Sequence, residues 1–258
     1  MNGIVTLAGH SASGAQLPVS IDYPAALALR QMALVQDELP KYLLAPEINA
    51  LLHYVPDLHR RMLLATLWNT GARINEALAL TRGDFSLVSP YPFVQLATLK
   101  QREEKAARSA GRPPAGATPH RLVPLSDNLY VSQLEMMVAT LKIPLERRNK
   151  RTGRTEKARL WEITDRTVRT WISEAVDAAS ADGVTFSVPV TPHTFRHSYA
   201  MHMLYAGIPL KVLQSLMGHK SVSSTEVYTK VFALDVAARH RVQFSMHERD
   251  AIAMLKGN

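Results

Sequence analysis

The sequence predicts a mainly helical α+β protein with one small antiparallel β-hairpin. Apolar residues recur at helical spacing through most of the 258-residue chain, and several of these segments start at a capping residue and stop at a glycine. Two runs rich in strand-forming residues, 93–100 and 121–125, flank a polar connection with Gly and Pro, which is typical of a long hairpin. With 47% hydrophobic and 20% charged residues, the chain can bury one sizeable core.

Residues 1–40 are expected to form a short extension with a single helix. Gly, Ser and Ala open this segment, and one apolar stretch follows from Tyr23, which is too little for a domain. The main domain, residues 41–258, should begin with a helix that has Pro46 in its first turn. Its apolar face is formed by Ile48, Leu51, Leu52 and Val55.

The next helix is predicted to begin at Asp57 as its N-cap and to end at Gly71, which suits a left-handed C-terminal position. Arg73 therefore follows a helix end. After the two strands, the segment from Arg147 to Arg159 has seven Lys or Arg residues and the single acid Glu156. Such a charge density cannot pack into a core, so we expect either a solvated loop or a phosphate-contacting surface.

The last third of the chain is predicted to be helical. Thr164 can cap a helix that ends near Gly183, and Thr191 can cap another with Pro192 in its first turn. Further interruptions are expected at the glycines 207 and 218. The tail from residue 235 to residue 258 has enough apolar residues for a short amphipathic helix.

Composition narrows the class of protein. A formal net charge of +8 favours a polyanionic partner, because Lys and Arg release its counterions on binding. Since the chain has no cysteine, disulfides, a thiolate nucleophile and cysteine-ligated metals are excluded. We find no run of about eighteen apolar residues and no signal-peptide pattern. A soluble protein of the cytoplasm without a membrane segment is therefore expected.

Chemistry-bearing residues follow one another in a recognisable order. They are Arg73 within Gly71-Ala-Arg-Ile-Asn-Glu76, Lys100 at the end of the first strand, His193-Thr-Phe-Arg196, Gly218-His219, and Tyr228. This series, spread over residues 44 to 232, resembles the tyrosine recombinase, or phage integrase, family. The resemblance implies the catalytic-domain fold of that family and an enzyme that cuts and rejoins DNA at specific sites through a 3′-phosphotyrosine.

The chemistry of this reaction calls for these residue types. Transfer of a phosphodiester to a phenol places negative charge on the non-bridging oxygens, which Arg73 and Arg196 can bind in bidentate fashion. A phenol also needs help to act as a nucleophile near neutral pH. The resemblance assigns acid-base work near Tyr228 to His193, and a hydrogen bond to the phosphate to His219.

The remaining roles follow from the same resemblance. Lys100 should give a proton to the departing 5′ oxygen, with Lys105 as the alternative if the hairpin register is shifted. Glu76 should orient Arg73 or His193 from behind. Because the energy of the broken linkage is kept in the phosphotyrosine, neither a metal nor another cofactor is expected.

Double-stranded DNA is the expected partner, with contacts from basic residues of the hairpin and of the 147–159 segment. We expect a homotetramer on two DNA sites, with the C-terminal tail docked onto a neighbouring subunit, and a monomer or a dimer free in solution. The DNA contacts are assigned to Lys105, Arg121, Arg147, Arg148, Lys150, Arg151 and Arg154.

Three alternatives stay open at this point. The segment from Met203 to Leu216 also has the pattern of a helix-turn-helix regulator without catalysis. A type IB topoisomerase would use a related tyrosine and would relax DNA without pairing two sites. His193 and His197, with His202 nearby, have a spacing that can hold a metal, although no acidic residue lies between them.

Overall fold

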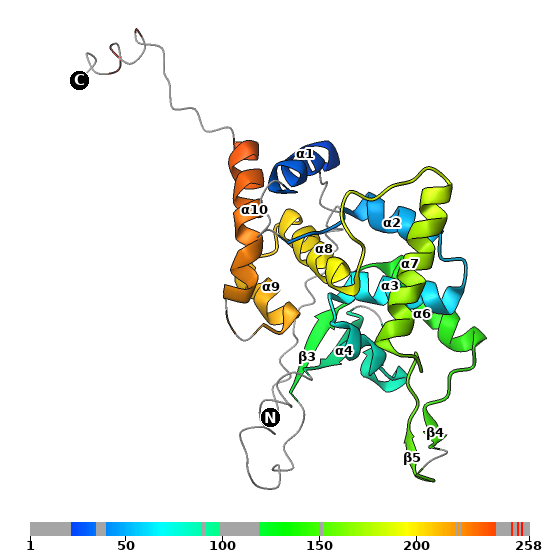
Figure 1. Ribbon diagram of the computed structural model, residues 1–258. Coiled ribbons are helices and arrows are strands. Elements are labelled where there is room, and N and C mark those ends of the chain that lie inside the picture. The colour runs from blue at the N-terminus through cyan, green and yellow to red at the C-terminus, as the bar shows by residue number, and fades with distance from the viewer. Residues whose placement is uncertain are drawn as a thin grey trace, which may run out of the picture.

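The structure is a computed structural model, and it describes residues 22–34, 40–88, 91–98, 119–149, 152–219, 221 and 223–240, together with 249, 252 and 254. Helices dominate it and small antiparallel sheets accompany them (Figure 1), which confirms the predicted fold class. The helices are α1 (Tyr23–Leu34), α2 (Ala45–His53), α3 (Leu58–Thr70), α4 (Ile74–Leu78), α6 (Asn128–Thr140), α7 (Asp165–Ala181), α8 (Pro192–Tyr205), α9 (Leu210–Met217) and α10 (Ser223–His240), and a 3-10 turn, η1, spans Arg82–Asp84.

The larger sheet has three antiparallel strands in the order β1 (Phe85–Ser86), β2 (Phe93–Ala97) and β3 (His120–Pro124). Leu96 pairs with Arg121, and Val94 pairs with Val123. Side chains alternate between buried and exposed along β3, as expected for a strand with one face on the core. The predicted hairpin strands are thus present where they are described, whereas residues 99–118 between them lie outside the described part.

Two clusters of buried side chains form the core. The larger one surrounds α3, whose residues Met62, Leu63, Leu64 and Leu67 have no exposed surface. The second cluster joins α1, α8, α9 and α10. Since α3 packs against both α6 and α8, it fixes α8 relative to the rest of the core.

Helix α6 was not predicted from the sequence. The Asp127 side chain caps it by accepting hydrogen bonds from the backbone N–H groups of Leu129 and Tyr130, at 2.9 and 3.2 Å. Tyr130, Leu134 and Met137 lie on its buried face. The cap and the i, i+4, i+7 spacing were therefore present in the sequence as signals for this helix.

The basic segment, expected to be a solvated loop or a phosphate-contacting surface, contains a two-stranded hairpin of β4 (Glu146–Arg148) and β5 (Thr155–Lys157). It projects from the body of the protein (Figure 1). Arg147 forms ion pairs with Glu156, at 2.9 Å, and with Glu162. Cross-strand pairing and these carboxylates give order to a segment that charge density alone marks as solvated.

Helix α1 is the helix expected in the N-terminal extension, and it lies beside α10 (Figure 1). Its Arg30 is buried and donates hydrogen bonds to Glu47 and, at 2.9 Å, to the Ser187 hydroxyl. A buried guanidinium needs such partners because its desolvation is costly. Arg30 therefore fastens α1 to the N-terminus of α2.

The predicted end of α3 at Gly71 is confirmed, with φ +59° at this C-cap. A Cβ at Gly71 would lie 2.3 Å from Tyr199 Cδ1, whereas a Cβ at Gly183, which also has positive φ, meets nothing within 4 Å. Both positions therefore favour glycine because of the left-handed backbone, but only at Gly71 would a side chain also collide with a neighbouring helix.

We expect Gly71→Ala to lower the free energy of unfolding by about 3 kcal/mol or more, because the left-handed conformation and the clash with Tyr199 add. Gly183→Ala has the backbone strain alone, which costs about 1 kcal/mol. Urea unfolding of both variants measures the difference. Equal losses would show that α3 and α8 can separate at this point.

Candidate active site

Helix α8 supplies several side chains of the site. Thr191 caps it by accepting a hydrogen bond from the Thr194 N–H at 3.2 Å, and Pro192 occupies its first turn. Both features agree with the sequence-based prediction. The helix packs against α3 on one side and against α9 and α10 on the other, so its side chains reach several helix ends.

Arg196 is buried, with 5% of its surface exposed. Its guanidinium donates hydrogen bonds to the carbonyl of Gly71 and, at 2.7 Å, to that of Met217. These carbonyls belong to the C-terminal ends of α3 and α9, where the helix dipole is negative and backbone acceptors lack helical partners. Burial and the nearby Arg73 lower the pKa of Arg196 to about 10, so it remains charged at neutral pH.

Glu76 joins two further arginines. Its carboxylate accepts hydrogen bonds from the Arg73 guanidinium at 2.9 Å and from the Arg121 guanidinium at 2.6 Å. It also accepts the backbone N–H of Arg73 at 3.0 Å. Burial acts to raise the pKa of Glu76, but the two guanidiniums outweigh it and hold the pKa below its usual value. Arg73 itself keeps 30% of its side chain exposed.

Arg121 has a different position from the one expected for a DNA contact. It is buried, and besides Glu76 it donates to the Leu216 carbonyl at 2.8 Å. The strand alternation explains this, because Arg121 lies on the same face of β3 as the buried Val123. Its Nη1 has no hydrogen-bond partner among the described residues. A Cβ at Gly218 would lie 3.0 Å from Arg121 Cδ.

Tyr228 lies on α10 and is 2% exposed. Its hydroxyl is 2.9 Å from His197 Nδ1. Burial raises the pKa of Tyr228 to about 12, although the charges of Arg196 and Arg73 act in the opposite direction. The tyrosine therefore lies within the electrostatic field of arginines of its own chain, and its phenol is neutral at pH 7.

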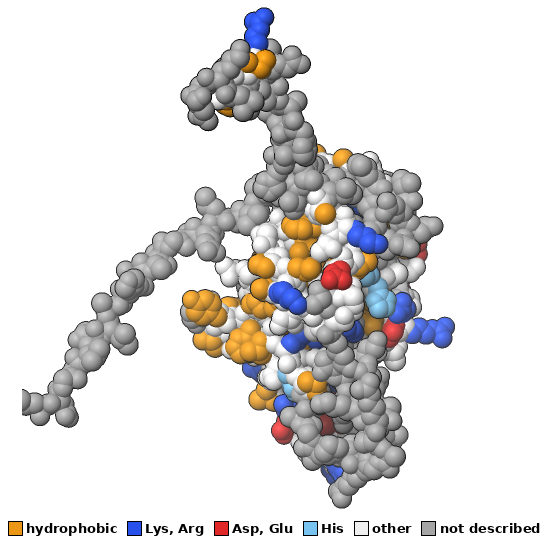
Figure 2. All heavy atoms as spheres, turned by 90° about the vertical axis from the view of Figure 1, so that its left-hand side faces the viewer, with side chains coloured by type: hydrophobic (Ala, Val, Ile, Leu, Met, Phe, Trp, Pro, Cys, Tyr) orange, Lys and Arg blue, Asp and Glu red, His pale blue; other side chains and the backbone are white. Residues whose placement is uncertain are grey.

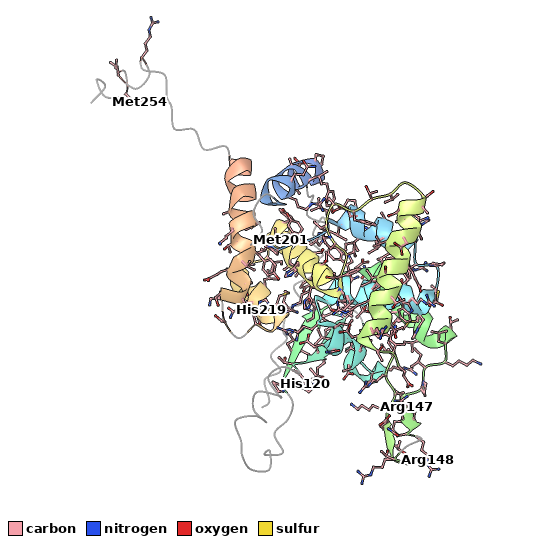
Figure 3. All side chains as sticks on the ribbon, in the orientation of Figure 1. His120, Arg147, Arg148, Met201, His219 and Met254 are labelled. Carbon is pink, nitrogen blue, oxygen red and sulfur yellow. The ribbon has the colours of Figure 1, made fainter. Side chains whose placement is uncertain are left out.

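His219 follows the left-handed Gly218, which ends α9 with φ +64°. Its Nδ1 is 2.8 Å from the Thr225 hydroxyl on α10. Burial, and then the charges of Arg196 and Arg73, lower the pKa of His219 to about 4. This imidazole is neutral at pH 7, so it can offer one N–H as a donor. Figure 3 shows His219 beside α9, far from Arg147 and Arg148 on the projecting hairpin.

The structure thus brings together Arg73, Arg196, His219 and Tyr228, with Glu76 behind Arg73. His193 is exposed at the start of α8. Arg147, Arg148 and Arg154 lie on or next to the β4–β5 hairpin. Four further residues singled out in the sequence lie outside the described part of the chain: Lys100, Lys105, Lys150 and Arg151.

His197 is the residue of this site that the motifs missed. The sequence presented it only as a spacing partner of His193 for a metal.

Within the described ranges, no group of three or more His, Cys, Asp or Glu side chains is arranged to hold a metal ion. In the same ranges no helix is long and apolar enough to cross a membrane.

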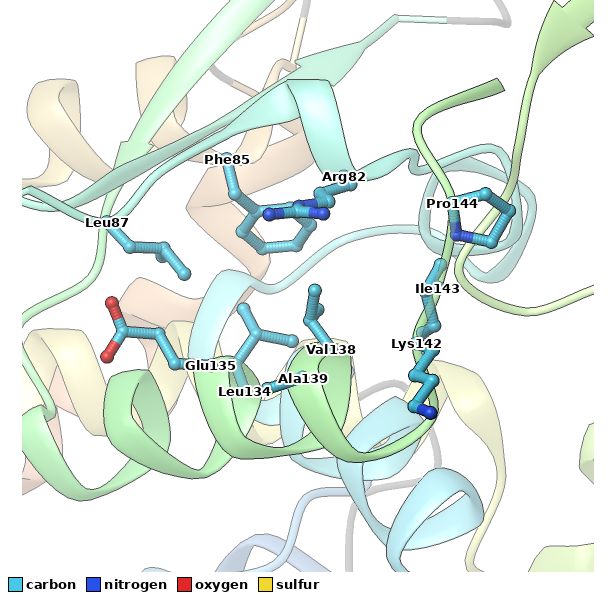
Figure 4. Close-up of a pocket in the computed structure, with 10 residues that line it drawn as sticks. All are labelled: Arg82, Phe85, Leu87, Leu134, Glu135, Val138, Ala139, Lys142, Ile143 and Pro144. Carbon is cyan, nitrogen blue, oxygen red and sulfur yellow. The ribbon is translucent and has the colours of Figure 1, made fainter. Parts of the chain in front are cut away.

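A separate cavity of about 660 Å³ lies between α6 and the η1–β1 segment (Figure 4). Leu134, Val138 and Phe85 form its apolar wall, and Arg82 and Lys142 lie at its charged margin. None of the site residues described above lines it.

Comparison with known proteins identifies the class. Residues 41–234 match the model of the phage integrase family. The chain therefore belongs to this family, the tyrosine recombinases. It is 85% identical over 247 residues to a resolvase of Escherichia coli, a match that covers 96% of this chain and 95% of the resolvase. It is also 46% identical over 258 residues to a probable site-specific recombinase in the afa region of Escherichia coli, covering 99% and 98% of the two chains.

The fold recurs in a solved structure. The crystal structure of the XerH site-specific recombinase bound to palindromic difH substrate matches with a TM-score of 0.56 and 18% identity, covering 79% of this chain and 53% of that one. At this identity the likeness concerns the fold alone. Family membership favours the recombinase over both the helix-turn-helix regulator and the type IB topoisomerase.

We expect Arg121→Met to lower the free energy of unfolding by about 2 to 3 kcal/mol, because the buried Glu76 loses a charge-assisted hydrogen bond and keeps Arg73 as its remaining guanidinium partner. Arg148→Met is the matched control. This exposed arginine of β4 should change stability by less than about 0.5 kcal/mol. Chemical denaturation followed by circular dichroism compares the two, and similar losses would contradict the structural role of Arg121.

Proposed function

We propose that this site-specific recombinase breaks and rejoins DNA with Tyr228 as nucleophile. The observation that supports it best is the Tyr228 hydroxyl, which lies in the field of Arg196 and Arg73 of the same chain. The phenolic oxygen attacks the scissile phosphorus, and the bond from phosphorus to the 5′ oxygen breaks. The phosphodiester is thereby kept as a 3′-phosphotyrosine, so that rejoining needs neither ATP nor a metal.

The charges of the site fit a phosphodiester. Three guanidiniums lie around the single carboxylate of Glu76, so the cluster has excess positive charge. Arg73, which is partly exposed, and Arg196 bind the non-bridging oxygens in this mechanism. His219 donates a hydrogen bond to the same phosphate. Preorganised donors of this kind stabilise the charge that develops in the transition state.

Protons are moved by two further residues in this mechanism. His193 acts as the acid-base group near the phenol, and Lys100 gives a proton to the departing 5′ oxygen, with Lys105 as the alternative. Glu76 holds Arg73 in place. These assignments come from the family resemblance, and each can be tested by its own variant.

Double-stranded DNA is the proposed partner, in the cytoplasm. Figure 2 shows Lys and Arg side chains scattered over the face where α10 lies, and the β4–β5 hairpin adds Arg148 and Arg154, with Lys150 and Arg151 nearby in sequence. Four copies are proposed to assemble on two sites, linked by the C-terminal tail of residues 235–258. The similarity to a protein named resolvase supports resolution of plasmid multimers as the task.

Covalent trapping tests the nucleophile. Nicked DNA fragments of the protein's own replicon, mixed with it in the absence of metal, should give a denaturant-resistant adduct that Tyr228→Phe abolishes while DNA binding persists. Tyr199→Phe is the control, because Tyr199 is also buried and its pKa is likewise raised to about 12 by burial. Tight binding without an adduct would turn the assignment towards a helix-turn-helix regulator.

The role of the β4–β5 hairpin in DNA binding can be tested through the salt dependence of affinity. Arg148→Gln should weaken binding to all DNA sequences and reduce the slope of log K against log salt by about one, because one phosphate contact is lost. Arg147→Gln should change this slope less, since Arg147 is already paired with Glu156 and Glu162. Filter binding over a salt series measures both. An unchanged slope for Arg148→Gln would show that Arg148 contacts no phosphate and that the hairpin is solvated surface.

A further inference from the structure

His197 is the imidazole that touches the nucleophile. It follows Arg196 on α8, and its Nδ1 lies 2.9 Å from the Tyr228 hydroxyl. The two ring centroids are 5.7 Å apart, and the ring planes are inclined by 58°. His193 lies one turn earlier on the same helix and is exposed. The motif that names His193 therefore passes over the histidine in direct contact with the phenol.

The direction of this hydrogen bond follows from the donors available. A neutral phenol has one O–H to donate, and Tyr228 is almost completely buried. If Nδ1 donated to the phenol, the phenolic proton would have no acceptor among the described residues, which is costly for a buried polar group. Burial, His193 and Arg196 also lower the pKa of His197 to about 4, so Nδ1 can carry a lone pair at neutral pH.

The position of His197 is itself fixed. Its neighbour Arg196 is held by the carbonyls of Gly71 and Met217, so α8 cannot rotate without breaking buried hydrogen bonds. Helix α10, which contains Tyr228, packs against α8 and α9. Because His197 and Arg196 are neighbours on α8, the hydrogen bond between His197 and the Tyr228 hydroxyl holds the attacking oxygen at a defined place relative to Arg196.

We propose that His197 is a positioning residue for the recombination reaction, whose Nδ1 accepts the Tyr228 hydroxyl and sets the direction from which the phenolic oxygen approaches the scissile phosphate. This inference rests on the proposed role of Tyr228. It assigns no proton transfer to His197. A displacement of a reacting group by about 1 Å can cost on the order of 100-fold in rate, which gives the scale of the effect.

Two substitutions separate positioning from proton transfer. Asn can place its amide oxygen near the position of Nδ1, so His197→Asn keeps an acceptor that takes no proton, whereas His197→Leu has none. In single-turnover cleavage of nicked DNA at saturating protein, we expect His197→Leu to lose about 100-fold and His197→Asn less than about tenfold. DNA affinity should stay within about threefold for both, since neither change removes a charge.

His202→Asn is the matched control. His202 lies on the same helix, is also partly buried, and packs on the Trp68 ring at 5.0 Å between centroids. It should cleave at the wild-type rate, with thermal unfolding used to compare the folds. A His197→Asn variant as slow as His197→Leu, or a His197→Leu variant as fast as wild type, would overturn the inference.

Nuclear magnetic resonance of the free protein gives a readout without catalysis. With ¹⁵N-labelled histidine, the His197 signals, assigned by their loss in His197→Asn, should show the Nε2–H tautomer with Nδ1 as acceptor, and Tyr228→Phe should shift Nδ1. An Nδ1–H tautomer, or no shift, contradicts the hydrogen bond whatever the activity. The expected spectrum in a protein that forms no adduct with DNA would instead refute the proposed function alone.

Discussion

The buried charge of Arg196 is the constraint on which the site depends. A guanidinium in the interior is tolerated only where its donors meet acceptors, and here these acceptors are carbonyls at the ends of α3 and α9. Both helices must therefore stop at the right place, and left-handed glycines, Gly71 and Gly218, stop them. One side chain thus fixes where two helices end and how closely α8 approaches them.

Glu76 is the buried anion that holds the other two arginines of the site. Because it is shared by Arg73 and Arg121, it ties the start of α4 to strand β3, and Arg121 extends the link to the Leu216 carbonyl of α9. The cluster is internally bonded and still has surplus positive charge. A site prepared in this way has little to reorganise when an anion arrives, which is the electrostatic requirement for stabilising a transition state.

The sequence predicted those features that local chemistry encodes. The caps at Asp57, Thr164 and Thr191, and the stop at Gly71, depend on residues next to each helix end, and the structure confirms them. Arg121 and His197 were misjudged or missed because their surroundings come from distant segments. The alternation along β3 would have placed Arg121 inside, but nothing near His197 in the chain indicates that α10 brings Tyr228 to it. Lys100 stays a prediction, since it lies outside the described residues.

Helix α1 limits how far the N-terminus of this protein can be shortened. The family model begins at residue 41, which suggests a natural boundary for a minimal domain. Yet Ala26 is fully buried in the cluster that also contains Tyr228, and Arg30 neutralises Glu47. A fragment trimmed to the family limits would expose an apolar face beside the nucleophile helix and leave a carboxylate without its counterion. In an engineered fusion, a partner protein should therefore be attached ahead of residue 22, so that α1 is kept.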